Sequence, residues 1–272
     1  MGRLLISSGR ECPFGCSYCF AKFSQYSRLK TLRDVEQDMS LLDGIWLVYP
    51  SCDDDIFATK TPVDTITRVA RWHRSISIST KARLSETVLA EIARINSELL
   101  EHNSVIKISI SASTRFRIDQ IERGTASFEE RLDNLRLLQS YDIPSGLVLK
   151  PLLSDEPINS YVHILKKGRI FTNNLLLGDE YLDQETKADT NTRYRQVNWL
   201  PSRPVWPVRE NEQLKHDVTI VAQQLGYRVF DNDVALVNAI LQEQLLQHRR
   251  TYDCQRDHHN DSRVYSVYRL GN

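Results

Sequence analysis

The sequence alternates six times between a short strand-like run and a helical segment, and no other feature restricts the fold as strongly. The strand-like runs are rich in Ile, Val and Leu, as buried strands are. We expect six strands, at residues 4–7, 45–49, 75–79, 105–110, 146–149 and 174–177. Alternation of strand and helix is typical of a parallel sheet with right-handed crossovers. We therefore predict an α/β fold.

Helix signals lie between these strands. Ser85 is an expected N-cap, and Ser127 with Glu130 has the spacing of a capping box. The expected helices cover residues 31–42, 63–73, 85–99, 127–141, 158–167, 211–225 and 233–246, and short strands are expected at 227–230 and 264–270. Residues 179–211 are polar and contain three prolines, so we expect a crossing loop there rather than regular structure.

Three cysteines follow the first strand at C-x3-C-x2-C spacing: Cys12, Cys16 and Cys19. Three thiolates can hold three irons of a cubane iron-sulfur cluster and leave the fourth iron open. A structural zinc site needs a fourth protein ligand, and no further Cys or His follows nearby. An open iron offers a coordination site for a substrate or cofactor. The alternative is a partial zinc site or a chance grouping of cysteines.

The cysteine loop, with Tyr18 just before its last cysteine, resembles the cluster motif of the radical S-adenosylmethionine (SAM) superfamily. In that family the open iron of a [4Fe-4S] cluster chelates SAM. An electron from the cluster then breaks the C5′–S bond, and the 5′-deoxyadenosyl radical takes a hydrogen atom from a substrate. The resemblance implies a low-potential reductant, such as flavodoxin or ferredoxin. It also implies a partial (β/α)6 TIM-like barrel, here with a C-terminal α-rich extension.

Ligands of such barrels bind at the C-terminal ends of the strands. The residues at these ends are most similar to the spore photoproduct lyase-like branch of the superfamily, over residues 1–180. The similarity implies that Lys81 binds the SAM carboxylate, that Ser51 and Ser111 bind its amine and ribose, and that Tyr18 and Phe20 lie beside the adenine. An exposed lysine and small hydroxyls at strand ends are also common without any such role.

Some residues match this branch and others depart from it. Glu122 and Arg131 match its motif, and they either serve the site or form a structural ion pair that fixes the loop after the fourth strand. Lys150 stands where the branch often has alanine, and Arg123 and Ala82 replace its proline and serine. Lys150 thus places a long cation beside the expected SAM or substrate pocket, and we include it among the cofactor-binding candidates.

Cys52 follows the second strand and is the candidate catalytic residue. In spore photoproduct lyase a cysteine near the end of strand two returns a hydrogen atom to the product radical, and Cys52 has a similar place. The resemblance implies that Cys52 is a hydrogen-atom donor facing the SAM pocket. The alternative is a buried cysteine that acts as a small apolar residue.

The composition excludes several classes of protein. The 272 residues balance 35 Lys and Arg against 35 Asp and Glu, which argues against a broad nucleic-acid or membrane surface. Three of the five cysteines lie in one loop, so they do not form a disulfide framework. The first apolar run is too short for a signal peptide, and no segment is long enough to span a bilayer. We therefore expect a cytoplasmic protein without a membrane partner.

We divide the chain into a radical SAM partial barrel (1–180) and a crossing loop with a C-terminal helical extension (181–272). The branch resemblance suggests a nucleic acid or nucleotide as substrate, in repair or modification. Arginines and lysines that would meet its phosphates are Arg28, Lys30, Arg33, Arg193, Arg195, Arg203 and Arg209. The alternative is that they are ordinary surface charges, which the neutral balance of the chain favours slightly. One alternative is a small metabolite or a peptide as substrate. Another is a zinc-stabilised binding module without catalysis.

Overall fold

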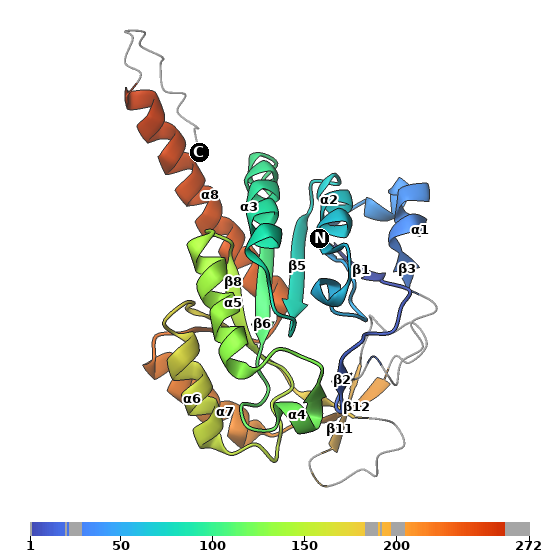
Figure 1. The fold of residues 1–272 in the computed structure, drawn as a ribbon, viewed down its shortest axis with the longest axis vertical. Coiled ribbons are helices and arrows are strands. Elements are labelled where there is room, and N and C mark those ends of the chain that lie inside the picture. The colour runs from blue at the N-terminus through green and yellow to red at the C-terminus, as the bar shows by residue number, and fades with distance from the viewer. Residues whose placement is uncertain are drawn as a thin grey trace, which may run out of the picture.

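The computed structural model describes residues 2–19, 21, 29–182, 190, 192–196 and 205–258, with side chains as far as residue 248. In this part of the chain, eight parallel strands form one open sheet (Figure 1). Their spatial order is β13 (Arg228–Phe230), β9 (Asn174–Leu177), β8 (Ser145–Leu149), β6 (Ile106–Ser111), β5 (Ser75–Thr80), β4 (Ile45–Tyr49), β1 (Gly2–Ser7) and β3 (Lys30–Thr31). The six expected strands are confirmed, and β13 and β3 extend the sheet at its edges.

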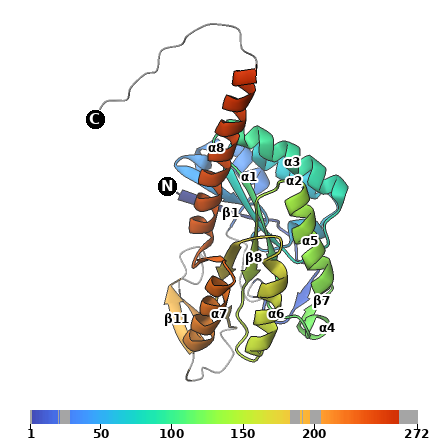
Figure 2. The ribbon, with the colours of Figure 1, turned by 90° about the vertical axis from the view of Figure 1, so that its left-hand side faces the viewer.

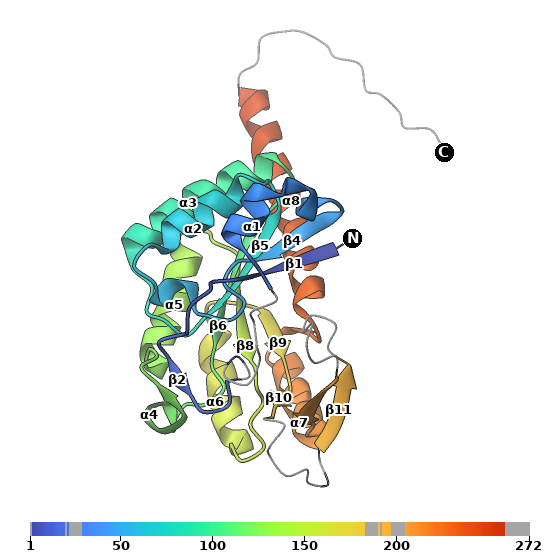
Figure 3. The same ribbon diagram turned by 90° about the vertical axis from the view of Figure 1, so that its right-hand side faces the viewer.

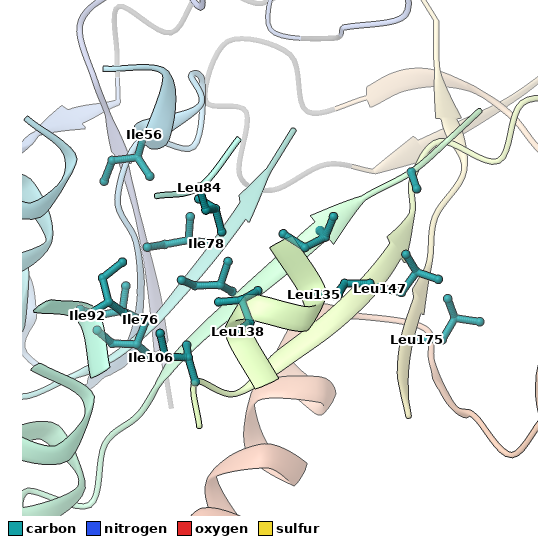
Figure 4. Packing of buried hydrophobic residues seen from close by; sticks show 14 of the residues in the cluster. Ile56, Ile76, Ile78, Leu84, Ile92, Ile106, Leu135, Leu138, Leu147 and Leu175 are labelled. Carbon is teal, nitrogen blue, oxygen red and sulfur yellow. The ribbon is translucent and has the colours of Figure 1, made fainter. Parts of the chain in front are cut away.

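Six helices cover one face of this sheet, which we call the outer face. They are α1 (Leu32–Gln37), α2 (Pro62–Ala70), α3 (Glu86–Glu101), α5 (Phe128–Ser140), α6 (Ile158–Gly168) and α7 (Glu212–Gln224). All six contribute side chains to one apolar cluster with the strands, part of which Figure 4 shows. The predicted caps are confirmed: Ser85 caps α3, and Ser127 with Glu130 forms a capping box at α5.

The alternation of side chains along the strands explains the difference between the two faces. In β5, Ile76 and Ile78 belong to the outer apolar cluster, whereas Ser75 and Ser77 do not. In β6 the same cluster takes every second residue, and Lys107 lies between its members. The inner face of these strands is therefore polar.

Helix α8 (Asp233–His258) lies on this inner face, whereas the six helices named above lie on the outer face. Its apolar residues pack against inner-face residues of the strands and form a second cluster: Leu236, Val237, Ile240 and Leu241 with Leu47, Val105, Val148 and Leu176. Figures 2 and 3 show that α8 then runs beyond the sheet. None of the described helices is both long and apolar enough to cross a membrane.

The expected crossing loop is wrong for part of residues 179–211. A three-stranded antiparallel sheet forms there, in the order β10 (Glu180–Tyr181), β12 (Val205–Arg209) and β11 (Thr192–Gln196). The strand expected at 227–230 is β13, and it pairs with β9 rather than standing apart. The first expected helix ends early, because α1 gives way to a 3-10 helix at Met39–Leu42. The strand expected at 264–270 lies outside the described residues.

Candidate active site

The cysteine loop between β1 and β3 is fixed to the loop that follows β6. Its short strand β2 (Gly15–Cys16) pairs antiparallel with β7 (Glu122–Arg123), next to the short helix α4 (Ile118–Ile121). The Ser17 amide donates to the Ile121 carbonyl at 2.8 Å. A Cβ atom on Gly15 would lie 3.1 Å from the Arg123 Cβ, so glycine permits this close pairing. Figure 1 shows β2 near the ends to which the strand arrows point.

The three loop cysteines are free, with Cys16 buried and Cys12 and Cys19 partly buried. Lys81 and Cys19 both act electrostatically on the Cys16 thiol. Burial raises the pKa of Cys12 to about 11, and the negative charge of Asp54 adds to this shift. Among the described residues, no three Cys, His, Asp or Glu side chains are grouped as metal ligands.

Three free thiols on one loop are the donor set that a cubane cluster with an open iron requires. The loop therefore fits such a cluster in its chemistry. A cluster bound by all three thiolates would need Cys12 to be deprotonated near the charge of Asp54, which disfavours the thiolate. A thiol that coordinates a metal is deprotonated, so binding would remove the proton that burial now keeps on Cys12.

Lys81 follows β5 and faces the cysteine loop. The Asp55 carboxylate accepts a hydrogen bond from the Lys81 amide at 2.7 Å and another from the Thr80 hydroxyl at 2.8 Å. The Lys81 carbonyl accepts from the Ala126 amide at 2.8 Å. Its ammonium lies 5.5 Å from the centre of the Tyr18 ring. Desolvation lowers the pKa of Lys81, because the ammonium has lost contact with water. An anionic ligand would replace that lost hydration with an ion pair.

Of the two alternatives for Glu122 and Arg131, the structure shows the ion pair, and it also involves the cysteine loop. The two charged groups lie 2.5 Å apart with their side chains almost fully buried. The Tyr18 hydroxyl donates to the Glu122 carboxylate, and an Arg131 nitrogen donates to the Ser111 carbonyl at 2.9 Å. The pair therefore joins the cysteine loop to the end of β6. Phe20 lies outside the described residues.

Several hydroxyls at the strand ends have no partner. The Oγ atoms of Ser51, Ser111 and Ser113 are buried and make no hydrogen bond in the part of the chain that the structure describes. An unsatisfied buried hydroxyl costs about 1–3 kcal/mol, which a bound ligand with polar groups would recover. Ser51 has a positive φ of 65° and lines a cavity of about 260 Å³ with Thr31 and Arg33. Lys81 does not line that cavity.

Cys52 is partly buried in the turn after β4, and its amide donates to the Ile6 carbonyl at 2.9 Å. Burial, with a smaller contribution from the charge of Asp53, raises the pKa of Cys52 to about 12. The thiol is therefore protonated at neutral pH. A protonated thiol is the form that can donate a hydrogen atom.

Two of the expected phosphate-binding arginines, Arg195 and Arg209, are already paired with carboxylates, whereas Arg33 and Arg193 are exposed. Arg195 in β11 contacts Asp179 at 2.7 Å and Glu210 at 2.6 Å. Arg209 in β12 contacts Glu180 at 3.3 Å. Arg28 and Arg203 lie outside the described residues. These pairs leave less free positive charge than the sequence suggests.

Asn134, which shapes the loop that carries Lys81, was not among the residues predicted for the site. The Asn134 side chain in α5 accepts from the Leu84 amide at 2.9 Å and donates to the Ala82 carbonyl at 2.7 Å. A signal was available, because Asn134 is a polar residue beside the apolar stripe of a predicted helix. Asp55, which accepts the hydrogen bond of the Lys81 amide, was not predicted as a site residue either.

Comparisons with known proteins agree with this architecture. The model of the family described as "Radical SAM superfamily" matches residues 6–166. No curated protein sequence is significantly similar to the chain.

Solved structures with a similar fold include a cysteine-to-serine mutant of spore photoproduct lyase, with 14% identity, 85% of this chain and 76% of that chain covered, and a TM-score of 0.62. Another mutant of that enzyme, with bound AdoMet and dinucleoside spore photoproduct, has 14% identity, the same coverage and a TM-score of 0.63. Streptococcus suis SuiB bound to S-adenosylmethionine has 11% identity, 85% and 49% coverage, and a TM-score of 0.57.

The family match spans more than half of the chain and includes all three loop cysteines, the end of β1 and the helix α5 that carries Arg131. The cofactors of that family are a [4Fe-4S] cluster and SAM, and its members are enzymes. The parallel sheet with its cysteine loop after β1 therefore identifies this chain as a member of the radical SAM superfamily.

Proposed function

We propose that this radical SAM enzyme acts on a nucleic acid or a nucleotide, in repair or modification. Cys12, Cys16 and Cys19 would hold the cluster, and Lys81 would bind the SAM carboxylate. When bound, the cluster and SAM supply a 5′-deoxyadenosyl radical that abstracts a hydrogen atom from the substrate. The observation that carries the assignment of the cluster and SAM is the position of Lys81. Its ammonium faces both Tyr18 and the thiols of the cysteine loop.

Other residues have proposed roles around Lys81. The unpartnered hydroxyls of Ser51 and Ser111 would form hydrogen bonds with the amine and the ribose of SAM. Tyr18 and Phe20 would lie beside the adenine. Cys52 would return a hydrogen atom to a product radical, for which its protonated thiol is suited.

The nucleic-acid part of the proposal is supported by the fold similarity to spore photoproduct lyase, one structure of which contains a dinucleoside photoproduct. A reductant of low potential, such as flavodoxin or ferredoxin, would supply the electron. A small metabolite or a peptide remains the alternative substrate, since Arg195 and Arg209 are already paired with carboxylates.

Anaerobic purification and reconstitution test the cluster. We expect a brown protein with iron and sulfide that forms 5′-deoxyadenosine from SAM under dithionite. Replacing Cys12, Cys16 or Cys19 with Ala should abolish this product without unfolding the barrel, because the loop lies at the strand ends. Cys254→Ala is the matched control, since Cys254 lies outside the residues that match the family.

Two results would contradict the proposal. A colourless protein with stoichiometric zinc would identify a binding module. Undiminished 5′-deoxyadenosine in the loop variants would show that these cysteines do not bind the cluster. The substrate is tested by adding irradiated DNA, nucleotides or peptide pools to the reconstituted enzyme. Turnover stimulated only by peptides or metabolites would overturn the nucleic-acid assignment and leave the radical chemistry in place.

A further inference from the structure

Lys150 lies on the inner face of the sheet, beyond the region that α8 covers. Along β8, Leu147 and Leu149 belong to the outer apolar cluster, whereas Val148 packs against α8 on the inner face. Side chains alternate along a strand, so Lys150, two residues after Val148, continues on the inner side. It occupies the C-terminal end of β8, next to the end of β6 that carries Ser111.

The structure makes room for the Lys150 side chain. A Cβ atom on Gly178, at the end of the neighbouring strand β9, would lie 2.6 Å from the Lys150 Cγ and 2.7 Å from its Cδ. Any larger residue at position 178 would therefore displace this lysine. The ammonium lies 5.7 Å from the centre of the Tyr181 ring in β10, which forms an adjacent wall.

Lys150 is exposed to solvent and has no ion-pair partner within the described part of the chain. Surrounding protein atoms desolvate the ammonium and lower the pKa of Lys150. The ammonium has therefore lost part of its hydration without gaining an ion-pair partner among the described residues. A cation in that position gains from any anion that enters, because the anion replaces the lost water interactions.

The nearest carboxylates are engaged elsewhere. Asp179 accepts from Arg195 at 2.7 Å. Asp233, at the start of α8, accepts from the fully buried Lys107 at 2.6 Å and from the Ser77 hydroxyl at 2.5 Å. Burial alone would raise the pKa of Asp233, but Lys107 and these hydrogen bonds hold it below its ordinary value. Both carboxylates therefore have their own cations, and Lys150 is left to a ligand.

We propose that Lys150 binds an anionic oxygen group of the substrate, a phosphate or a carboxylate, on the inner face above the Lys107–Asp233 pair. The ring of Tyr181 forms one wall of this site and Gly178 provides its space. Alanine at this position, as is common in the spore photoproduct lyase-like branch, has no charge. This assignment rests on the proposed function, because it names the substrate class of the same site, and it moves Lys150 from the cofactor to the substrate.

Ligand binding tests this assignment without requiring turnover. The reconstituted enzyme is titrated with thymidine 5′-monophosphate and with thymidine, in the presence and absence of SAM, by calorimetry. A charge-assisted hydrogen bond favours the monophosphate by roughly tenfold to a hundredfold. Lys150→Ala should remove this preference and leave the affinity for SAM unchanged. Gly178→Ala should weaken it as well, since the added Cβ displaces the lysine.

Lys167→Ala is the matched control, because Lys167 is an exposed lysine in the last turn of α6. Competition with inorganic phosphate and with acetate identifies the group that is bound, and displacement by either supports the assignment. The absence of a preference in the wild-type protein, a preference that survives in Lys150→Ala, or no competition by either anion would overturn it. Weaker SAM binding in Lys150→Ala would instead show that this lysine belongs to the SAM-binding site, and would overturn the assignment to the substrate. Failure of the cluster test alone would leave these binding results unaffected.

Discussion

The buried ion pair between Glu122 and Arg131 should contribute far more to the free energy of unfolding than an exposed pair of the same length. Both Arg131–Glu122 and Arg68–Glu36 join their charged atoms at 2.5 Å. The side chains of the first pair are 1% and 0% exposed, whereas those of the second are 44% and 36% exposed. The two pairs thus differ in burial and not in distance.

Glu122→Gln keeps the shape of the side chain and an acceptor for Tyr18, but it leaves the Arg131 charge without its carboxylate. Removing one partner of a buried pair costs about 3–5 kcal/mol. Arg131 retains three acceptors, on Ala126, Ser111 and Thr125. We therefore expect a loss near the lower end, about 3 kcal/mol.

Glu36→Gln is the control and should cost only about 0.2–1 kcal/mol, as exposed pairs do. The assay is urea unfolding of anaerobically prepared protein, followed by circular dichroism. Glu122→Gln combined with Arg131→Met should recover most of the loss, because no uncompensated charge stays buried. Equal effects of Glu122→Gln and Glu36→Gln would refute the reasoning, since burial would then not decide the contribution of the pair.

Two further predictions concern Lys81 and Cys52. Lys81→Ala should weaken SAM binding roughly tenfold to a hundredfold through loss of a charge-assisted hydrogen bond, with unchanged iron content; an unaltered SAM affinity measured by equilibrium dialysis would make Lys81 an ordinary surface lysine. The Cys52 thiol, whose pKa burial raises to about 12, should be alkylated by iodoacetamide at pH 8 on the order of a thousandfold more slowly than a free cysteine of pKa about 8.5. Because the pKa of Cys52 is higher in the folded than in the unfolded chain, its contribution to stability should fall as the pH rises from about 8.5. Rapid alkylation at pH 8, read by mass spectrometry, would contradict the expected slow labelling.

Much of the sheet could be predicted because its signals are local. The strand runs, the caps at Ser85 and Ser127 and the position of the cysteine loop all follow from neighbouring residues. The pairing of Lys107 with Asp233 has no such signal, because it joins a strand to a helix 126 residues further along the chain. The same is true of the contact between Tyr18 and Glu122, which are 104 residues apart.

The antiparallel sheet after β9 was missed because its prolines are loop signals. Pro207 lies in the central strand β12, where a proline is normally unfavourable because it has no N–H to donate. Its carbonyl accepts from the Leu182 amide at 3.0 Å, and in an antiparallel pair the carbonyl and N–H of one residue face the same neighbour. That neighbour, β10, pairs only through Glu180 and Tyr181, so the missing N–H falls where β10 has ended.

One property of the strands explains both where α8 packs and where the site lies. On the inner face, two of the apolar positions that contact α8 are followed two residues later by a residue outside its cluster, Val148 by Lys150 and Leu176 by Gly178, whereas Tyr49 and Lys107 still meet α8 through its apolar cluster and through Asp233. The inner face therefore changes from apolar to polar toward the C-terminal ends of the strands. A helix with an apolar stripe can bury itself against the first part only, because the second part would leave charges such as Lys150 without water or a partner. The uncovered part lies at the ends of β8 and β9, near the strand ends that carry the cysteine loop, and this is where the proposed anionic substrate would meet SAM.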